Sequence, residues 1–314
     1  MQIGIIGTGM VGSAIAYSLA TEGTAEKLIL IDYNKDRAKA EAMDISHATP
    51  FSFGAKVIAG DYSDLKDTGI IIITAGANQK PGETRLDLLA RNVEIFKSII
   101  PEIKKYAPDS ILIVASNPVD IMTEVTLKLS GFSPHRVFGT GTVLDSSRFR
   151  NSLGRYLGIS PTSIHANVIG EHGDSEVLIW SGAVAGTTGI ENIARQLNIS
   201  LNSDIKKEID NDVRNAAYMI INGKGSTYYG IAAATEHIIS AIIGDSHMIL
   251  TVSTHHDKTI GGYNNICYST PAIISKNGVE AALIPVMNDT EQNALIKSAE
   301  KLSEFTKQAL ELIK

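Results

Sequence analysis

The sequence contains very little cysteine and few aromatic residues. Its 314 residues include a single cysteine, Cys267, and one tryptophan. One cysteine cannot form an internal disulfide, and it excludes the zinc clusters that are built from cysteines. We therefore expect no metal site, and a lone thiol is typical of proteins in the reducing cytoplasm.

Positive charge is also scarce. The sequence has 28 basic and 34 acidic side chains, and its net charge is −6. A protein that binds the phosphate backbone of nucleic acids needs an excess of basic groups or a basic run. The sequence has neither of these features. Nucleic acid is therefore not an expected partner.

Charge is absent altogether from the first 21 residues, as it could be in a targeting or membrane segment. A secretory signal, however, starts with positive charge and continues with an unbroken apolar core. This stretch has no Lys or Arg and is interrupted by Gly4, Gly7, Gly9 and Gly12. Each glycine also costs a helix about 1 kcal/mol relative to alanine. Neither a signal peptide nor a membrane anchor is expected.

Short apolar runs alternate with helical patterns in the first 140 residues. The runs are rich in Ile and Val and too short for helices, so they predict buried parallel strands. They cover Gln2–Ile6, Leu28–Ile31, Lys56–Ala59, Ile70–Ala75 and Ser110–Ala115. Helical spacing lies between them at 13–21, 36–47 and 92–106. This rhythm predicts an α/β fold, a Rossmann-type doubly wound parallel sheet with helices on both faces.

The pattern becomes less regular after about Val143. Helical segments appear at 145–157, 203–222 and 227–243, and strand-like sequence follows between 243 and 283. A last helix begins near Asn288, with a buried stripe that ends at Leu312. A chain of this length suggests about two domains. We predict the Rossmann domain over residues 1–142 and an α+β domain over residues 143–314.

Gly7, Gly9 and Gly12 form a GxGxxG pattern between the first apolar run and the first helical pattern. In this context Gly7 permits the tight turn, Gly9 lets a pyrophosphate approach the backbone, and Gly12 lets helix and strand pack closely. Asp32 ends the second run, where its carboxylate would bind ribose hydroxyls and repel a 2′-phosphate. The pattern predicts NAD rather than NADP. The alternative is a glycine-rich turn in another kind of α/β protein.

Six segments together resemble the lactate and malate dehydrogenase family, and most closely its bacterial L-lactate-specific members. They extend over most of the chain in one order: GIIGTGMVGSAIA at 4–16, AGANQKPGETRLDLL at 75–89, SNPVD at 116–120, LDSSRFR at 144–150, IGEHGDSE at 169–176 and KGSTYYGIA at 224–232. The resemblance implies reversible hydride transfer between NADH and pyruvate, the last step of fermentative glycolysis. It also implies that the second domain binds the substrate and holds the catalytic groups.

The resemblance assigns catalytic roles to His172, Asp145 and Arg85. An imidazole has an unperturbed pKa of about 6.5, so it is a natural proton donor to a ketone near neutral pH. His172 would give its proton to pyruvate, and Asp145 would fix the tautomer and stabilise the imidazolium. Arg85, in a segment that closes as a lid, would stabilise negative charge on the carbonyl oxygen.

Substrate binding is assigned by resemblance to Arg148, Asn117, Gln79 and Thr227, together with Arg85. The planar guanidinium of Arg148 suits a carboxylate. Asn117 would donate to the substrate oxygen, and the family suggests a cis bond before the next residue, Pro118. Malate dehydrogenases typically have an arginine where this chain has Gln79, so a second substrate carboxylate would lack a partner here. Thr227 would limit the bulk of the substrate side chain.

The cofactor contacts that the family implies lie in three of these segments, except for Asp32, which ends the second apolar run. They are Gly7, Gly9, Met10, Val11, Gly12, Asp32, Ala75, Gly76, Ser116 and Asn117. Two rival functions remain open: another 2-hydroxy acid dehydrogenase of the same fold, and a non-catalytic dinucleotide-binding protein. The latter would have no need for His172, Asp145, Arg148 and Arg85 together.

Arg150 and His165 match the positions that bind fructose 1,6-bisphosphate in allosteric bacterial members of the family. In those enzymes the site lies on a two-fold interface, where two subunits supply two Arg and two His to the two phosphates. The alternative is a surface arginine and an ordinary histidine. The resemblance thus implies a sugar-bisphosphate effector and a homotetramer, arranged as a dimer of dimers.

Overall fold

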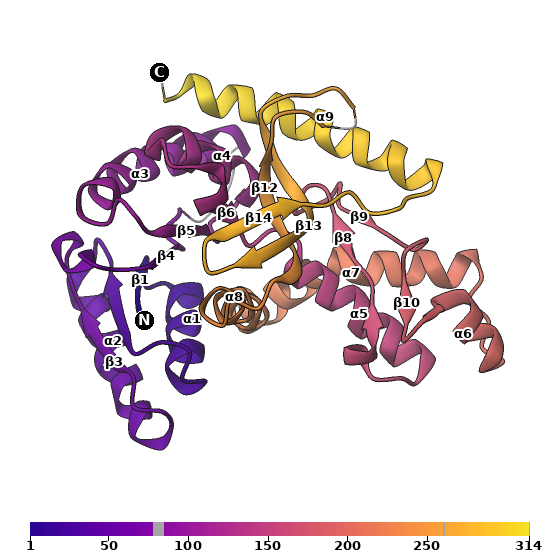
Figure 1. The fold of residues 1–314 in the computed structure, drawn as a ribbon, viewed down its shortest axis with the longest axis horizontal. Coiled ribbons are helices and arrows are strands. Elements are labelled where there is room, and N and C mark those ends of the chain that lie inside the picture. The colour runs from indigo at the N-terminus through magenta and orange to yellow at the C-terminus, as the bar shows by residue number, and fades with distance from the viewer. Residues whose placement is uncertain (78–84, 260, 314) are drawn as a thin grey trace.

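A long mixed sheet forms the centre of the molecule (Figure 1). The computed structural model describes residues 1–77, 85–259 and 261–313, without the side chain of Arg85. The strand order of the sheet is β14-β13-β12-β6-β5-β4-β1-β2-β3. Strands β1 to β6 are parallel and follow the order of a Rossmann sheet, so the predicted fold class is confirmed.

The first half of the chain builds the parallel strands and the helices between them. Its elements are β1 (Gln2–Ile6), α1 (Met10–Thr21), β2 (Lys27–Ile31), α2 (Lys35–Ala48), β3 (Lys56–Ala59), β4 (Ile70–Ile73), α3 (Arg85–Tyr106), β5 (Ile111–Val114), α4 (Val119–Ser130) and β6 (Val137–Gly139). Each predicted strand lies within two residues of its expected ends. Helix α4 and strand β6 are additional to the sequence prediction.

Both faces of the parallel sheet are covered, which explains its continuous apolar strands. Strand β4 consists of four buried isoleucines. Because successive side chains point to opposite faces, Ile71 and Ile73 pack in a core with α3, α4 and α9 (Asp289–Glu311), whereas Ile70 and Ile72 pack in a core with α1 and α8 (Tyr229–Ile243). Figure 1 shows these two helical layers on either side of the sheet.

The second half adds antiparallel strands to the same sheet and a smaller unit beside it. Strand β12 pairs with β6 through Ser253 and Gly139, and β13 and β14 follow. A third core lies between α5, α6 and α7. The remaining elements are α5 (Val143–Leu157), β7 (Ile164–His165), β8 (Val168–Ile169), β9 (Val177–Leu178), β10 (Val184–Ala185), β11 (Thr188–Gly189), α6 (Ile190–Gln196), α7 (Ser203–Lys224), β12 (Met248–His256), β13 (Ile266–Ser275) and β14 (Gly278–Ala282).

Helix α9 begins as the sequence predicts and ends slightly earlier. Asn288 is its N-cap and forms a reciprocal capping box with Glu291. Leu295, Ala299 and Leu302 are buried, but Leu312 is the C-cap and is 39% exposed, so its predicted burial is wrong. Within the described part of the chain, no helix is both long and apolar enough to cross a membrane.

Candidate active site

The glycine loop after β1 has the shape that the GxGxxG pattern predicts. Gly7 has a φ of +98°, and a Cβ there would lie 2.6 Å from the backbone nitrogen of Ala75. A Cβ on Gly12 would lie 1.9 Å from the Gly7 oxygen, so helix α1 packs where only glycine fits. A Cβ on Gly9, in contrast, would have no heavy atom within 4 Å. The backbone is therefore open at the one glycine where a pyrophosphate would approach.

Electrostatics at this loop also favour a dinucleotide. Helix α1 begins at Met10 without an acidic residue in its first turn, so its N-terminal amides and partial positive charge are available to an anion. Asp32, at the end of β2, accepts hydrogen bonds from the Thr8 amide at 2.6 Å and from its hydroxyl at 3.0 Å. This carboxylate is fixed beside the glycine loop, where it suits ribose hydroxyls better than a 2′-phosphate. The residues present fit NAD.

The segments after β4 and β5 are tied together beside the same edge of the sheet. The Ser116 hydroxyl donates to the Ala75 carbonyl at 2.6 Å. Asn92, buried on α3, accepts from the Ala77 amide at 2.8 Å and donates to the Asn117 carbonyl at 2.9 Å. The bond between Asn117 and Pro118 is cis, as the family resemblance suggested. Ligands bind at this carboxyl edge in open parallel sheets.

The loop that carries His172 is held from three sides. The His172 amide donates to Asp120 Oδ2 at 2.8 Å, and the Ser253 hydroxyl donates to the other Asp120 oxygen at 2.6 Å. Glu171, the preceding residue, accepts from Lys301 of α9 at 2.8 Å. These contacts hold the loop through the His172 amide and the Glu171 side chain.

Asp145 lies at the centre of the catalytic candidates. It is buried in the first turn of α5, and one of its oxygens accepts from His172 Nδ1 at 2.6 Å. The other oxygen accepts from Arg148 Nη1 at 2.7 Å, since the two residues are one turn apart. The imidazole is about one-quarter exposed, at 25%, whereas Asp145 is 2% exposed. The structure thus brings together three residues that the motifs placed in two separate segments.

These contacts raise the proton affinity of the imidazole. Burial acts to lower the pKa of His172, but the charge and hydrogen bond of Asp145, with Asp120 and Glu176 nearby, raise it to about 9. Burial alone would raise the pKa of Asp145, yet His172 and Arg148 hold it below its usual range. The raised pKa of His172 and the lowered pKa of Asp145 both favour the imidazolium–carboxylate form of the pair. An imidazolium can donate a proton to a carbonyl oxygen.

Two further carboxyl groups near His172 were not assigned roles from the sequence. Burial raises the pKa of Asp120 to about 6. Burial and the charge of Asp145 raise the pKa of Glu176 to about 8, and its buried Oε1 has no hydrogen-bond partner in the part of the chain that the structure describes. Both residues, and Asn92, stand in or near the quoted motifs. In the sequence, a polar residue within a buried segment could have pointed to each of them. Their contact partners, however, are distant in sequence, so their roles could not be read from it.

A cavity of about 500 Å³ lies beside α5. Arg148 and Thr227 line it, as does Arg150, so two expected substrate residues and one expected effector residue border one space. Among the described residues, His172 is not part of this lining. We therefore do not equate the cavity with the substrate pocket. Gln79 lies outside the described residues, as does the side chain of Arg85, which begins helix α3.

The two expected effector residues lie on different elements. Arg150, on α5, donates from Nε to the Ser146 carbonyl at 3.2 Å and is one of the residues that line the cavity. His165 is exposed on the short strand β7. Helix α5 and strand β7 are in contact with each other.

An NAD-binding sheet edge with a buried aspartate–histidine pair defines a dinucleotide-dependent oxidoreductase. The chain matches the NAD-binding domain of lactate/malate dehydrogenase over residues 1–139 and the α/β C-terminal domain of the same family over residues 142–313. It therefore belongs to the lactate/malate dehydrogenase family, and NAD is its cofactor.

Several relatives are similar over nearly their whole length. An L-lactate dehydrogenase from Allorhizobium ampelinum is 49% identical over 305 residues, which cover 97% of this chain and 98% of the relative. One from Thermus aquaticus is 46% identical over 302 residues, covering 96% and 97%. Among solved structures, a lactate dehydrogenase from a Medee basin deep-sea metagenome has a TM-score of 0.94 at 38% identity, with 98% of each chain covered.

Proposed function

We propose that this chain catalyses the reversible reduction of pyruvate to (S)-lactate with NADH. The observation that carries the proposal is the Asp145 carboxylate, which binds His172 at 2.6 Å and Arg148 at 2.7 Å near the NAD site. The relatives named as L-lactate dehydrogenases support the choice of substrate. We place the activity in the cytoplasm, as the last step of fermentative glycolysis.

The protein would position and protonate a substrate, while bound NADH supplies the hydride. His172, protonated at neutral pH, donates a proton from Nε2 to the ketone oxygen, and in the reverse direction the neutral imidazole accepts it. Asp145 keeps the proton on Nδ1 and stabilises the imidazolium. The fixed loop around His172 holds the ring in place for this transfer.

Four other side chains complete the proposed substrate site. Arg148 binds the carboxylate with its planar guanidinium. Asn117 donates to the ketone oxygen, and Arg85 approaches the same oxygen when the lid segment closes and excludes water. Thr227 limits the size of the substrate side chain. Arg148 already contacts Asp145, so carboxylate binding and imidazole orientation share one carboxyl group.

The proposed NAD contacts follow the carboxyl edge of the sheet. Gly9 faces the open space for the pyrophosphate, and Asp32 binds the adenosine ribose. The full set is Gly7, Gly9, Met10, Val11, Gly12, Asp32, Ala75, Gly76, Ser116 and Asn117. We assign residues 1–142 to the cofactor domain and residues 143–314 to the substrate domain.

The proposed reaction is tested by following NADH oxidation with pyruvate and, separately, with oxaloacetate. We expect pyruvate to have the higher kcat/KM, because a second carboxylate would be desolvated without a partner. Higher kcat/KM with oxaloacetate would favour a malate dehydrogenase. No turnover with either acid, from a protein that binds NADH, would favour the non-catalytic alternative.

Changing Gln79 to arginine is expected to shift substrate preference toward oxaloacetate. The new guanidinium would pair with the second carboxylate, whereas pyruvate has no group for it. The ratio of the two kcat/KM values should change by on the order of tenfold or more, the size of one charge-assisted hydrogen bond. Gln79→Glu serves as the matched control and should not gain oxaloacetate activity. An unchanged ratio in Gln79→Arg would refute the role of Gln79.

We further propose a homotetramer, a dimer of dimers, that fructose 1,6-bisphosphate activates through Arg150 and His165. The bisphosphate would favour the state that binds pyruvate, so the apparent KM for pyruvate should fall when it is added. Arg150→Gln should abolish this response and leave turnover at saturating pyruvate intact. A hyperbolic saturation curve that millimolar bisphosphate does not move would dismiss the effector, and sizing of the native protein tests the assembly.

A further inference from the structure

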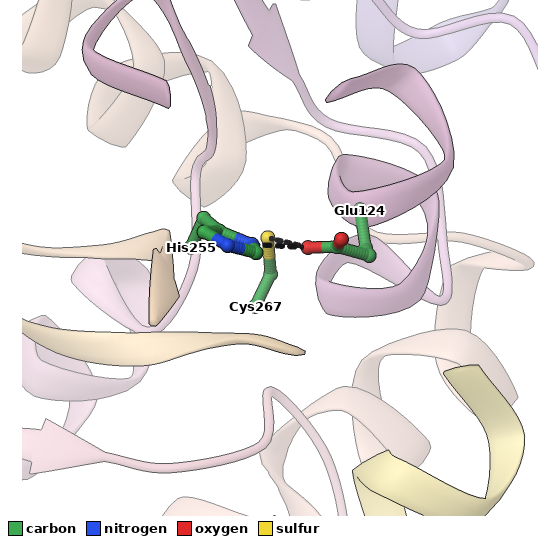
Figure 2. A group of neighbouring side chains, drawn as sticks. All are labelled: Glu124, His255 and Cys267. Carbon is green, nitrogen blue, oxygen red and sulfur yellow. Dashed lines mark hydrogen bonds and ion pairs between the residues drawn. The ribbon is translucent and has the colours of Figure 1, made fainter. Parts of the chain in front are cut away.

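Three potential metal ligands converge away from the catalytic pair, between helix α4 and strands β12 and β13 (Figure 2). His255 and Cys267 are directly opposite each other in the antiparallel pairing of these strands. Glu124 reaches them from α4, and Figure 2 shows its carboxylate pointing at the thiol and the imidazole. One ligand atom from each residue lies within 4.8 Å of the other two.

The two carboxylate oxygens of Glu124 have different surroundings. Its Oε2 accepts from His255 Nδ1 at 2.7 Å and from the Cys267 thiol at 3.2 Å. Its Oε1 is fully buried and, among the described residues, has no hydrogen-bond partner, but it forms an ion pair with the half-exposed Lys128 ammonium at 3.7 Å. Burying this carboxylate costs free energy that one half-exposed ammonium offsets only in part, and a cation bound at Oε2 would offset more of it.

We propose that Glu124, His255 and Cys267 form a binding site for a borderline-soft divalent cation such as Zn²⁺. Thiolate, imidazole and carboxylate are the three ligand types that zinc takes in proteins. The carboxylate and the thiolate balance the two positive charges of the cation, so the centre is neutral and its burial is inexpensive. A site with one thiolate differs from the cysteine clusters that the composition excludes.

The geometry requires only a small expansion. Tetrahedral zinc with bonds of about 2.0–2.3 Å holds its ligand atoms about 3.5 Å apart. The present separations of 2.7 and 3.2 Å reflect hydrogen bonds whose protons the cation would replace. Binding would release the thiol proton and the Nδ1 proton to solvent. The described residues supply three ligands, which leaves a fourth position for water.

A supporting contact orients the imidazole for this role. His255 Nε2 lies 3.2 Å from the Asp257 carboxylate, so Nδ1 is the nitrogen directed at the proposed cation. Metal-binding histidines usually donate their second ring N–H to such a group. Helix α4 links this site to the catalytic loop. Asp120 lies one turn before Glu124 on α4 and accepts a hydrogen bond from the His172 amide. A bound cation would stiffen this helix against the sheet.

Cobalt titration of the chelator-treated full chain tests the proposal directly. Cys267 is the one cysteine in the sequence, so a thiolate-to-cobalt charge-transfer band can arise only from this site. We expect the band to saturate at one equivalent and to disappear when zinc displaces the cobalt. The Tm of the wild type should rise with zinc as the native state is bound preferentially.

Variants separate the site from adventitious binding. Cys267→Ser should lose the band, and the exposed Asp257→Asn should weaken affinity by roughly 10- to 100-fold, as supporting contacts of metal ligands do. Asp257→Asn leaves the core intact and serves if Cys267→Ser does not fold. His47→Gln, exposed on α2, is the matched control and should bind normally. Absence of the band in the wild type, or an equal zinc-dependent rise of Tm in Cys267→Ser, would overturn the proposal.

Discussion

Replacement of His172 by glutamine is expected to lower kcat/KM for pyruvate reduction by roughly 10²- to 10⁴-fold, the usual contribution of a positioned general acid. Glutamine can still donate a hydrogen bond to the ketone oxygen, but its amide N–H is not acidic enough to transfer a proton. NADH affinity should change little, because the glycine loop and Asp32 are independent of the imidazole. Steady-state rates and NADH fluorescence titration measure the two effects separately.

The expected fall in kcat/KM of His172→Gln has to be distinguished from the effect of a displaced loop. The backbone amide of residue 172, which donates to Asp120, is retained in the variant, so the loop keeps its anchor. His47→Gln makes the same substitution at an exposed histidine of α2 and should keep wild-type rates. A His172→Gln enzyme within tenfold of the wild type, with unchanged Tm, would show that another group protonates the substrate.

Where chain segments have a strong pattern, the sequence predicts the fold well. The isoleucine-rich strands and the GxGxxG turn are local features, and the structure has them where expected. Helix α4 was not predicted, and its residues from Val119 to Leu127 are all buried, the polar Asp120, Thr123, Glu124 and Thr126 included. Polarity in this segment therefore does not indicate which residues face the core. Strand β6 has three residues, too few for a pattern. Leu312 continues the spacing of α9, but the helix ends at Glu311.

Some residues of the candidate site could also be predicted from local sequence, whereas others could not. The motifs identify Asp145, His172 and Arg148 by residue type, and the fold brings them together. Asp120 and Asn92 support this site through contacts that span 52 and 25 residues. Such contacts depend on how α3, α4 and the loops pack, which no local pattern encodes. Their roles therefore required the structure.

Replacement of Asp145 by asparagine is expected to lower kcat/KM for pyruvate reduction by on the order of 10³- to 10⁴-fold. The size follows from aspartate–histidine pairs in hydrolases, where an asparagine stabilises the wrong imidazole tautomer. Here the amide would also remove the charge that Arg148 and His172 share at 2.7 and 2.6 Å. The new side chain is nearly isosteric, so burial and packing at the start of α5 are retained.

The pH dependence distinguishes this role from a structural one. Asp145 contributes to raising the pKa of His172 to about 9, so its removal should lower that pKa. Pyruvate reduction uses the protonated imidazole and should therefore decline at a lower pH in the variant than in the wild type. Lactate oxidation uses the neutral imidazole, so its rise with pH should also move to lower pH. Both kcat/KM profiles are measured, because free-enzyme groups determine them.

A shift of both kcat/KM profiles to lower pH distinguishes the two explanations, since a destabilised protein would lose both activities without a shift of either pH profile. Asp212→Asn removes a carboxylate from the exposed pair with Arg155 and serves as the control. Its profiles should match the wild type, because a surface ion pair is screened and distant from the reaction. If Asp145→Asn folds normally and keeps the wild-type midpoints, Asp120 and Glu176 must supply the field that protonates His172, and Asp145 would then act only as an anchor for the ring.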